Sequence, residues 1–427
     1  MKRAFALTLV LLLTLTACGV APAGPPEPPA EDPAEPVEIK LWTYPVGEWG
    51  NPTAISGLVS GFQRANPDIR LTVEHLDYDT GDARVEEAVA SGTLPDLVLE
   101  SPERLLSDWG ERGLMADLGD LWETEQAGAV YDAVRAACRR GDGTYCVYPI
   151  CMSTHCMAIN YDLFQAAGAL QYLDEEKRTW STEGFIQAVE ALRAYGQEQA
   201  AAVYCGGQGG DQGTRALVTN LCGGSFTDPE HTRYTVDSPE NIRALELLRD
   251  LEGVDFDPAL QGAGEIERFC KGELAMAFCW NGSLEVVHTV KNPDLDFRIL
   301  AMTFPTETGE PRLQSGIWGF GVFDSGDEAR IAAAKAFIRY VAGDDARYTQ
   351  AVQIANFWPV RDMPGIYDND PLMSAYSAFI PYADDYCQVT PNWVAARGAW
   401  WKMLQRVGAG EDVSAAVQAF SREVSGG

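Results

Sequence analysis

Aromatic and acidic side chains stand together at the ends of the first three strands that the sequence predicts. Trp42 ends the first strand and Tyr44 follows it, Asp77 follows the second strand, and Glu100 ends the third. Aromatic rings stack on the apolar face of a sugar ring, and carboxylates accept hydrogen bonds from paired hydroxyl groups. Because ligands of open α/β sheets lie at the carboxyl ends of the strands, these four residues predict a site for a hydroxyl-rich ligand.

Further candidate ligand-binding residues lie in loops and at the ends of later strands. The sequence has 11 tryptophans, and several of them fall at strand ends or in loops, where a ligand can reach them. Packing is an equal alternative for Trp318, which lies within an apolar strand, and a helix cap or an exposed charge is the alternative for Asp77 and Glu100. The later candidates are Tyr148, Asn160, Trp280, Asn281, Trp318 and Trp358.

The sequence contains no motif that singles out a catalytic or cofactor site. A carboxylate pair for glycoside hydrolysis cannot be chosen among 62 acidic residues. The glycine-rich segment 206–214 lacks the lysine that precedes threonine in a phosphate-binding loop. Ser91 and Ser283 lack the flanking glycines of a serine-hydrolase elbow, and the four histidines are dispersed. We therefore expect a protein that is not an enzyme and has no cofactor.

A cluster of cysteines and one histidine invites comparison with zinc sites. Cys146, Cys151, His155 and Cys156 lie close together in the sequence. Their spacing matches no structural zinc pattern, so we expect no metal site and interpret the cluster as packing or disulfides.

The pairing of the cysteines cannot be deduced from their number. Ten are present, and nine remain once Cys18 is set aside for the reason given below. Outside the reducing cytosol, pairs such as Cys138 with Cys146 or Cys270 with Cys279 could form disulfides. Free buried thiols are the alternative, and the sequence leaves both open.

The charge balance argues against nucleic acid as a partner. The chain has 62 acidic and 32 basic residues and a formal charge of −30. Phosphate binding rests on clustered lysines and arginines, and no basic stripe is longer than Arg139–Arg140. Anionic membrane surfaces are disfavoured on the same ground.

The N-terminal segment has the features of a bacterial export signal. Within residues 1–17, the basic residues Lys2 and Arg3 precede an apolar stretch that is too short to span a bilayer of about 30 Å. The stretch ends in Leu-Thr-Ala-Cys, which resembles a lipobox, although an ordinary signal peptide with a chance cysteine is the alternative. We expect lipidation of Cys18 and a proline-rich tether at 18–37, which would anchor an extracytoplasmic protein to the cell membrane.

Short strands and helices alternate at the start of the predicted folded part. Alternating β-branched residues predict strands at 37–42 and 69–74, and an apolar run predicts a third strand at 95–100. Asn51–Pro52 opens a helix between the first two strands, and a second helix is predicted at 83–90. This order with short connections predicts a parallel sheet that is covered by helices.

Later elements continue the α/β pattern with less regularity. Helices are predicted to begin at 180–182 and at 238–239, and two more span 331–341 and 394–407. The chain has no internal repeat, and its length is typical of more than one folded part, so we expect an α/β protein with two lobes. The later strands are predicted at 157–160, 275–280, 297–302 and 317–323.

Six segments follow one another in an order that is typical of a known family. They are Phe62–Ile69, Ala90–Val98, Met157–Phe164, Gly272–Gly282, Phe297–Pro305 and Gly316–Phe320. Together they resemble the bacterial extracellular solute-binding proteins, family 1, which serve ABC importers of sugars and oligosaccharides. Cys146 departs from the pattern, because the family often has an aromatic residue at that place.

The resemblance implies a periplasmic-binding-protein fold, a two-lobed clamp in which each lobe is a sheet flanked by helices and the ligand cleft lies between the lobes. The N-terminal lobe would contain 38–152 and 283–342, and the other lobe 153–282 and 343–427. The protein would be a monomer that binds a carbohydrate, most simply an oligosaccharide. It would deliver this ligand to the transmembrane permease subunits of an ABC importer.

The residues leave more than one ligand class open. The resemblance places ligand contacts at Trp42, Trp280 and Trp358, which favours a sugar. The same fold could instead bind a polyamine, because acidic and aromatic side chains together attract cations. A surface glycosidase or adhesin would share only the architecture.

Overall fold

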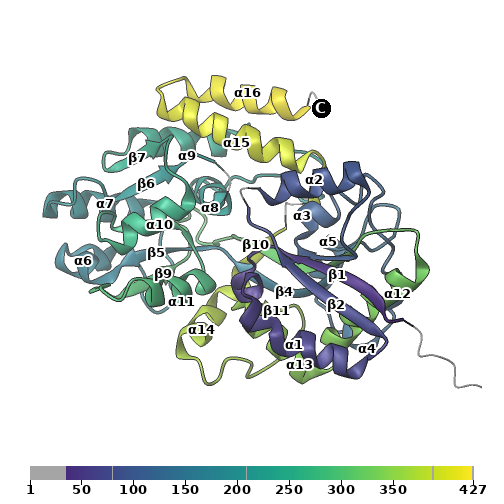
Figure 1. The fold of residues 1–427 in the computed structure, drawn as a ribbon. Helices are drawn as coiled ribbons and strands as arrows, with labels where there is room; N and C mark the ends of the chain where they lie inside the picture. The colour runs from purple at the N-terminus through teal and green to yellow at the C-terminus, as the bar shows by residue number, and fades with distance from the viewer. Residues whose placement is uncertain (1–34, 79, 208, 387–388, 426–427) are drawn as a thin grey trace, which may run out of the picture. The chain divides into compact units, whose positions relative to one another are not determined.

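The computed structural model describes residues 35–78, 80–207, 209–386 and 389–425. The predicted signal peptide at 1–17, the predicted lipidation site Cys18 and all but the last residues of the tether at 18–37 lie outside the described residues. The chain divides into two compact units, and every described residue except Glu35 belongs to the second, Pro36–Gly427 (Figure 1).

The first sheet carries the strand ends that the sequence analysis singled out. Its strands are β1 (Val37–Thr43), β2 (Ile69–His75), β3 (Leu97–Glu100), β4 (Tyr148–Thr154), β10 (Leu313–Val322), β11 (Trp358–Pro359) and β12 (Ala383–Asp385). Their order is β11–β4–β10–β3–β1–β2, with β12 beside β10. β2 and β3 both run parallel to β1, which confirms the predicted parallel arrangement. β10 runs antiparallel to β3 and to β4.

A second group of strands forms two smaller sheets. These strands are β5 (Cys156–Asn160), β6 (Ala201–Tyr204), β7 (Val254–Asp257), β8 (Met276–Trp280) and β9 (Ile299–Met302). β5 lies between β8 and β9 and is antiparallel to both, while β6 and β7 form a parallel pair. The segment 283–342, which was assigned as one block to the N-terminal lobe, thus contributes β9 to the second group and β10 to the first. The lobe boundaries stay a prediction.

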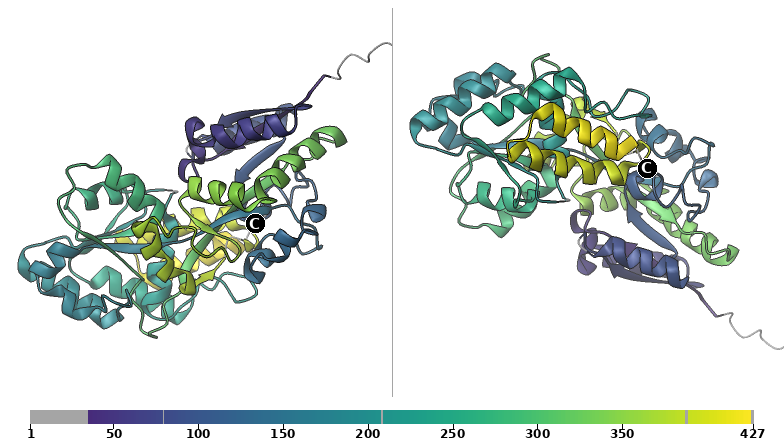
Figure 2. Two further views of the ribbon diagram at one scale, coloured as in Figure 1. Left: turned by 90° about the horizontal axis from the view of Figure 1, so that it is seen from below. Right: turned by 90° about the horizontal axis from the view of Figure 1, so that it is seen from above.

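Helices cover both groups of strands (Figures 1 and 2), which confirms the predicted α/β class. The longer helices are α1 (Pro52–Ala65), α2 (Gly81–Ser91), α7 (Thr182–Tyr195), α8 (Asp211–Leu221), α9 (Pro239–Asp250), α10 (Gly262–Cys270), α11 (Gly282–Lys291), α12 (Glu328–Ala342), α13 (Asp345–Ala355), α15 (Trp393–Gly408) and α16 (Val413–Ser425). The shorter ones are α3 (Pro102–Leu105), α4 (Glu125–Gly128), α5 (Asp132–Ala137), α6 (Tyr161–Ala166) and α14 (Pro371–Tyr376). The last two helices of the chain, α15 and α16, lie side by side in all views.

The helix α1 forms where the cap and the apolar pattern in the sequence predict a helix. The side chain of Asn51 accepts a hydrogen bond from the backbone N–H of Thr53 at 3.0 Å, so that the helix begins with a satisfied donor. Leu58 and Phe62 lie on its buried face. The ring of Phe62 packs edge-on against Phe337 of α12, with ring centroids 5.2 Å apart. A capped amphipathic helix of this kind is held in place by its apolar face.

The chain passes from the first sheet to the second group of strands at a single residue. β4 ends at Thr154, β5 begins at Cys156, and only His155 lies between them. The backbone N–H of His155 donates to the carbonyl of Gln314 on β10 at 2.9 Å, and the side chain is buried. The imidazole is therefore fixed where the two groups of strands meet.

The described cysteines are all free. Eight buried thiols are present, so neither Cys138 with Cys146 nor Cys270 with Cys279 forms a disulfide in this structure. Burial raises the pKa of the Cys146 thiol to about 11, which keeps it protonated and unreactive near neutral pH. Among the described residues no group of three or more His, Cys, Asp and Glu side chains is arranged to hold a metal ion. Within the same residues, the helices are all too short or too polar to cross a membrane.

Candidate ligand-binding site

A cavity of about 350 Å³ lies where the carboxyl end of β3 meets the second group of strands. Its volume is in the range of small-molecule sites. The first sheet and its connections contribute Tyr78, Glu100, Ser101, Glu103, Arg104, Gly316, Trp318 and Phe357. The remaining lining residues are His155, Gly209, Gly210, Gln212, Ala263, Ile266, Cys279, Asn281, Leu284, His288 and Arg397.

A larger hollow of about 660 Å³ lies elsewhere, beside 171–174 and 306–309. None of its described lining residues carries a buried polar side-chain atom without a partner. The smaller cavity has several such atoms, and it also lies at the strand ends where ligands of α/β proteins bind. We therefore take the smaller cavity as the candidate site.

Aromatic rings form part of the cavity wall. Trp318 stacks on Phe357 with ring centroids 4.6 Å apart and an angle of 25° between the planes. On the β3 side, Tyr78 stacks on Tyr44 with centroids 5.2 Å apart, and the guanidinium of Arg104 lies 5.0 Å from the Tyr44 ring. Trp318 is half-buried and Tyr78 is 41% exposed, so both rings keep surface for a ligand.

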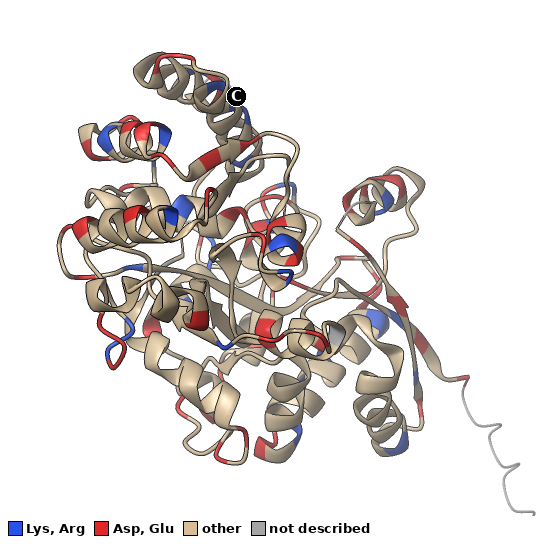
Figure 3. Cartoon of the chain, turned by 90° about the vertical axis from the view of Figure 1, so that its left-hand side faces the viewer, with Lys and Arg blue, Asp and Glu red and all other residues tan. Residues whose placement is uncertain are grey.

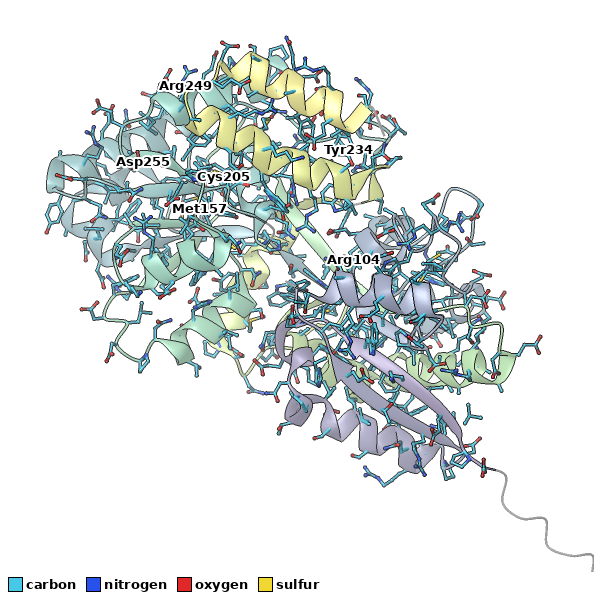
Figure 4. All side chains as sticks on the ribbon, turned by 45° about the horizontal axis from the view of Figure 1, so that its top comes forward. Arg104, Met157, Cys205, Tyr234, Arg249 and Asp255 are labelled. Carbon is cyan, nitrogen blue, oxygen red and sulfur yellow. The ribbon has the colours of Figure 1, made fainter. Side chains whose placement is uncertain are left out.

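Arg104 of α3 organises the charges at the end of β3 (Figure 4). Its side chain donates two parallel hydrogen bonds to Asp82, of 2.8 and 3.0 Å, and a third of 2.9 Å to Oε1 of Glu100. Glu100 also accepts a hydrogen bond from Ser101 at the same oxygen, 3.1 Å away. Arg104 is thus a buried cation shared between two carboxylates.

Arg397 of α15 connects this region with the second group of strands. It donates to both carboxylate oxygens of Asp211 on α8, at 3.0 and 2.8 Å, and also to Glu103 of α3. Asp211 receives a further ion pair from Arg215. Burial alone would raise the pKa of Asp211, but the two guanidinium groups hold it below its usual value. Asp211 is therefore ionised at neutral pH.

Several buried polar atoms at the cavity have no hydrogen-bond partner among the described residues. They are Oε2 of Glu100, both ring nitrogens of His155 and Oε1 of Gln212. Burial lowers the pKa of His155 to about 4, with Arg215 acting in the same direction, so the imidazole is neutral and offers one donor and one acceptor. Buried polar groups without partners are costly. A ligand in the cavity would remove this cost.

Three of the predicted site residues line this cavity, and a fourth lies directly behind it. Glu100, Asn281 and Trp318 are lining residues. Asn281 also caps α11, because its side chain accepts a hydrogen bond from the backbone N–H of Leu284 at 2.9 Å. Tyr44 does not line the cavity but supports Tyr78, and its hydroxyl donates to Asp82 at 2.7 Å.

The other predicted tryptophans lie outside the cavity lining. Trp42 is buried beneath the guanidinium of Arg84, 4.6 Å from the ring centroid. Trp280 is completely buried, and its indole N–H donates to the Tyr376 hydroxyl at 2.8 Å. Trp358 is buried and packs edge-on against a tyrosine ring. Their assignment as ligand contacts stays a prediction.

The three remaining predicted residues also make local contacts away from the cavity. Asp77 accepts a hydrogen bond from the backbone N–H of Thr80 at 2.6 Å. Asn160 caps α6 by accepting from the backbone N–H of Leu163 at 3.0 Å. Tyr148 is buried against a tryptophan ring. The N-cap of α2 is Thr80, so the bond made by Asp77 belongs to the turn before that helix.

Sequence reasoning missed most of the charged residues of the site. Glu103 and Arg104 come directly after the third predicted strand, so continuing the search past the strand end would have found them. Arg397 gave no local signal, because its partner Asp211 is far away in the sequence. His155 was considered only as a zinc ligand and rejected.

Comparisons with known proteins agree with this fold. The sequence pattern of the bacterial extracellular solute-binding proteins matches residues 57–378. A comparison with proteins of curated function gives no match.

Solved structures of several bacterial proteins are similar to this chain over almost their whole length. Lmo0181 from Listeria monocytogenes, solved in complex with cycloalternan, is 19% identical with a TM-score of 0.73, covering 92% of this chain and 99% of that chain. The GacH receptor of Streptomyces glaucescens, solved with acarbose, is 15% identical with a TM-score of 0.74. The match covers 91% of this chain and 99% of that chain. UgpB from Mycobacterium tuberculosis, solved with glycerophosphocholine, is 19% identical with a TM-score of 0.72. The match covers 92% of this chain and 98% of that chain.

At these identities the likeness concerns the fold, and it confirms the predicted solute-binding fold with sheets flanked by helices. The family match spans most of the folded unit and includes the strands β3, β8 and β10, which contribute residues to the cavity lining. The chain therefore belongs to the bacterial extracellular solute-binding proteins.

Proposed function

We propose that the protein binds a carbohydrate, most simply an oligosaccharide, in the 350 Å³ cavity and delivers it to the permease of an ABC importer. The observation that carries this proposal is the presence, in one cavity, of the stacked Trp318–Phe357 pair and of polar atoms of Glu100 and His155 that have no partner among the described residues. The rings suit the apolar face of a pyranose, and the polar atoms suit its hydroxyl groups.

Delivery requires a change that the permease can recognise. The cavity is lined by residues from both groups of strands, so a ligand that contacts both would favour a closed arrangement over an open one. The free energy available for this shift is the difference in ligand affinity between the two states. The proposed role is binding without turnover, carried out by a monomer that Cys18 anchors to the outer side of the cell membrane.

The test is a thermal-shift screen of the folded unit from Pro36 onward, with mono-, di- and oligosaccharides, polyamines and sugar phosphates. A ligand at 100 times its dissociation constant should stabilise the protein by about 2.7 kcal/mol. Trp318→Ala should remove the shift. Trp401→Ala is the matched control, because Trp401 is also half-buried but does not line the cavity. Incubation of a bound glycan followed by product analysis should show no cleavage.

A polyamine is the second candidate, favoured by the buried Glu100 oxygen that lacks a partner among the described residues. A thermal shift with spermidine and with no saccharide would replace the carbohydrate assignment and leave the binding role intact. Cleavage of a glycan by the purified protein would instead establish the glycosidase alternative.

A further inference from the structure

Arg397 joins the two sides of the cavity. It lies on α15, which packs on the second group of strands, and Trp400 of the same helix donates a hydrogen bond to Thr214 of α8 at 3.0 Å. On that side Arg397 donates to both oxygens of Asp211. On the side of the first sheet it donates to Glu103 of α3, the short helix that follows β3. The Arg397 and Glu103 side chains are 7% and 8% exposed, so bulk water does not screen the pair.

On the side of α15 and α8, two buried guanidinium groups share one carboxylate. Arg215 of α8 and Arg397 both pair with Asp211. Among the described residues, the only other ion pair of these two arginines is the one between Arg397 and Glu103. Arg215 and Asp211 are at most 1% exposed, so water cannot take the place of a missing carboxylate. Glu103 therefore supplies the second negative charge, and it can do so only while α3 and α15 are in contact.

Glu103 has no equivalent partner on its own side among the described residues. Arg104 of the same helix approaches it only to 4.0 Å. The hydrogen bonds of Arg104 go to Asp82 and Glu100 instead. Charged residues are otherwise spread over the helices and loops of the chain (Figure 3), and many of their ion pairs are open to water. The Glu103–Arg397 pair is instead buried at the cavity, which both residues line.

We propose that Glu103 and Arg397 are positioning residues, and that their ion pair favours the closed arrangement in which the first sheet and the second group of strands enclose the ligand together. This inference rests on the proposed function and names a contact that raises the affinity of its site. In an open arrangement water would solvate the two side chains separately. In the closed arrangement each of them needs the other, because a buried charge without a partner is strongly unfavourable.

Removal of one partner therefore differs from removal of both. Without the charge of Glu103 alone, closure buries two guanidinium groups with one carboxylate. Without the charges of Glu103 and Arg397 together, Asp211 and Arg215 remain as a balanced pair. Breaking a buried pair is costly in general, whereas replacing both partners by uncharged groups costs little. A residue that acted by contacting the ligand would show no such compensation.

The experiment measures the dissociation constant of one saccharide for four forms of the folded unit by isothermal titration calorimetry. The forms are the unmodified protein, Glu103→Gln, Arg397→Gln and the double variant, and the probe is the saccharide with the largest shift in the thermal-shift screen. We expect Glu103→Gln to weaken binding about tenfold or more. The double variant should bind within about threefold of the unmodified protein, because it restores the charge balance at Asp211.

Glu86→Gln is the matched control. Glu86 accepts two hydrogen bonds from Arg112, of 2.6 and 2.9 Å, so it is also a glutamate paired with an arginine. Both residues come from the chain between β2 and β4, and neither lines the cavity. Neutralising this pair should leave the dissociation constant within about twofold of its original value.

Glu103→Lys gives a second measurement that does not depend on the folding of the Arg397 variants. It places a second cation opposite Arg397, and like charges in contact should hold the two sides apart. Small-angle X-ray scattering at a saturating concentration of the same saccharide should then give a larger radius of gyration for Glu103→Lys than for the unmodified protein. Equal radii would overturn the inference.

The outcomes separate the two proposals. An unchanged dissociation constant in Glu103→Gln would overturn the inference and leave the carbohydrate function standing. Weaker binding in Glu103→Gln that the double variant does not recover would also overturn it, because Glu103 would then act on the saccharide directly. No binding of any saccharide in the screen would overturn the carbohydrate function and this inference with it.

Discussion

The position of the Trp318 ring depends on the absence of a side chain at Gly316. The two residues are two positions apart on β10, so they face the same side of the sheet. A Cβ atom at Gly316 would come within 2.3 Å of the outer edge of the Trp318 ring. The ring therefore lies directly over the backbone at Gly316 while it stacks on Phe357. Glycine at position 316 therefore allows the Trp318 ring to lie close to the backbone of β10.

We expect Gly316→Ala to displace the Trp318 ring, because keeping the ring in place would cost about 1–3 kcal/mol of stability through overpacking. The displaced ring should lose its contact with the ligand and weaken binding by about tenfold. The measurement is the dissociation constant of the best ligand from the thermal-shift screen. Gly398→Ala is the control, because a Cβ at that position of α15 contacts nothing within 4 Å. It should leave binding unchanged and stabilise the helix by up to ~1 kcal/mol. An unaltered dissociation constant in Gly316→Ala would contradict the assigned position of the ring.

A site residue could be predicted from the sequence only where a local pattern, such as the end of a strand, places it at the cavity. Glu100 and Asn281 were found because a strand end places them, and strand ends can be located from local patterning. Trp280 also lies at the end of a strand, but its ring is buried in the core. The direction of the ring depends on tertiary packing, which the local sequence does not reveal. Arg397 could not be predicted, because its role exists only once α15 packs beside α8 and α3.

A buried carboxyl group fastens the helix α10 to the strand β8. Glu265 is completely buried, and its two oxygens accept hydrogen bonds from the backbone N–H groups of Phe278 and Cys279 at 2.7 and 2.8 Å. Burial raises the pKa of Glu265 from 4.5 to about 8, although these two hydrogen bonds act in the opposite direction. Because β8 leads directly to Asn281, this contact also fixes one wall of the cavity.

The pKa of Glu265 predicts a pH-dependent contribution to stability. Between pH 4.5 and about 8 the folded protein keeps a proton that the unfolded chain has lost. The contribution of Glu265 therefore falls as the pH rises through this window, and little further change follows above it. In the variant Glu265→Gln the side chain is uncharged throughout. The unfolding free energy of the unmodified protein minus that of the variant should thus decrease from pH 5 to pH 8, as measured by urea denaturation.

Glu267→Gln provides the matched control for that measurement. Glu267 lies on the same helix, is 63% exposed and pairs with Lys271 across one turn. Its replacement should change the free energy of unfolding by less than about 0.5 kcal/mol at any pH in the window. A difference for Glu265→Gln that does not vary with pH would show that Glu265 is ionised in the folded protein.

Elements with strong local signals were predicted well, and elements that depend on distant partners were not. The strands β1, β2 and β3 and the helix α1 begin and end within a few residues of their predicted bounds, because alternation, caps and proline mark them in the sequence. β4 was missed as a strand, since its side chains are all buried and no alternation distinguishes it. The insertion of β10 between β3 and β4 could not be predicted, because pairing partners leave no local signal.

The predicted lipid anchor concerns the whole molecule, because it determines where the folded unit is held. We expect Cys18→Ala to release the protein from the membrane fraction, since each buried methylene of a lipid chain adds about 0.8 kcal/mol to membrane binding. Cell fractionation with immunoblotting measures this, and mass spectrometry of the N-terminal peptide identifies the lipid. The variant Cys387→Ala is the control and should stay with the membrane. Retention of Cys18→Ala in the membrane fraction would refute the predicted anchor.

The pairing of β10 with β3 has a consequence for the order in which the protein can be made and folded. Glu100 pairs with Gly319, so the edge of β3 stays open until a segment more than two hundred residues later has arrived. Contacts this distant slow folding, because closing the long intervening loop costs conformational entropy before the contact forms. The chain is synthesised from its N-terminus, so the first three strands emerge well before β10 is available to pair with β3. Until then β3 has β1 as a neighbour but lacks β10, so this part of the sheet is incomplete.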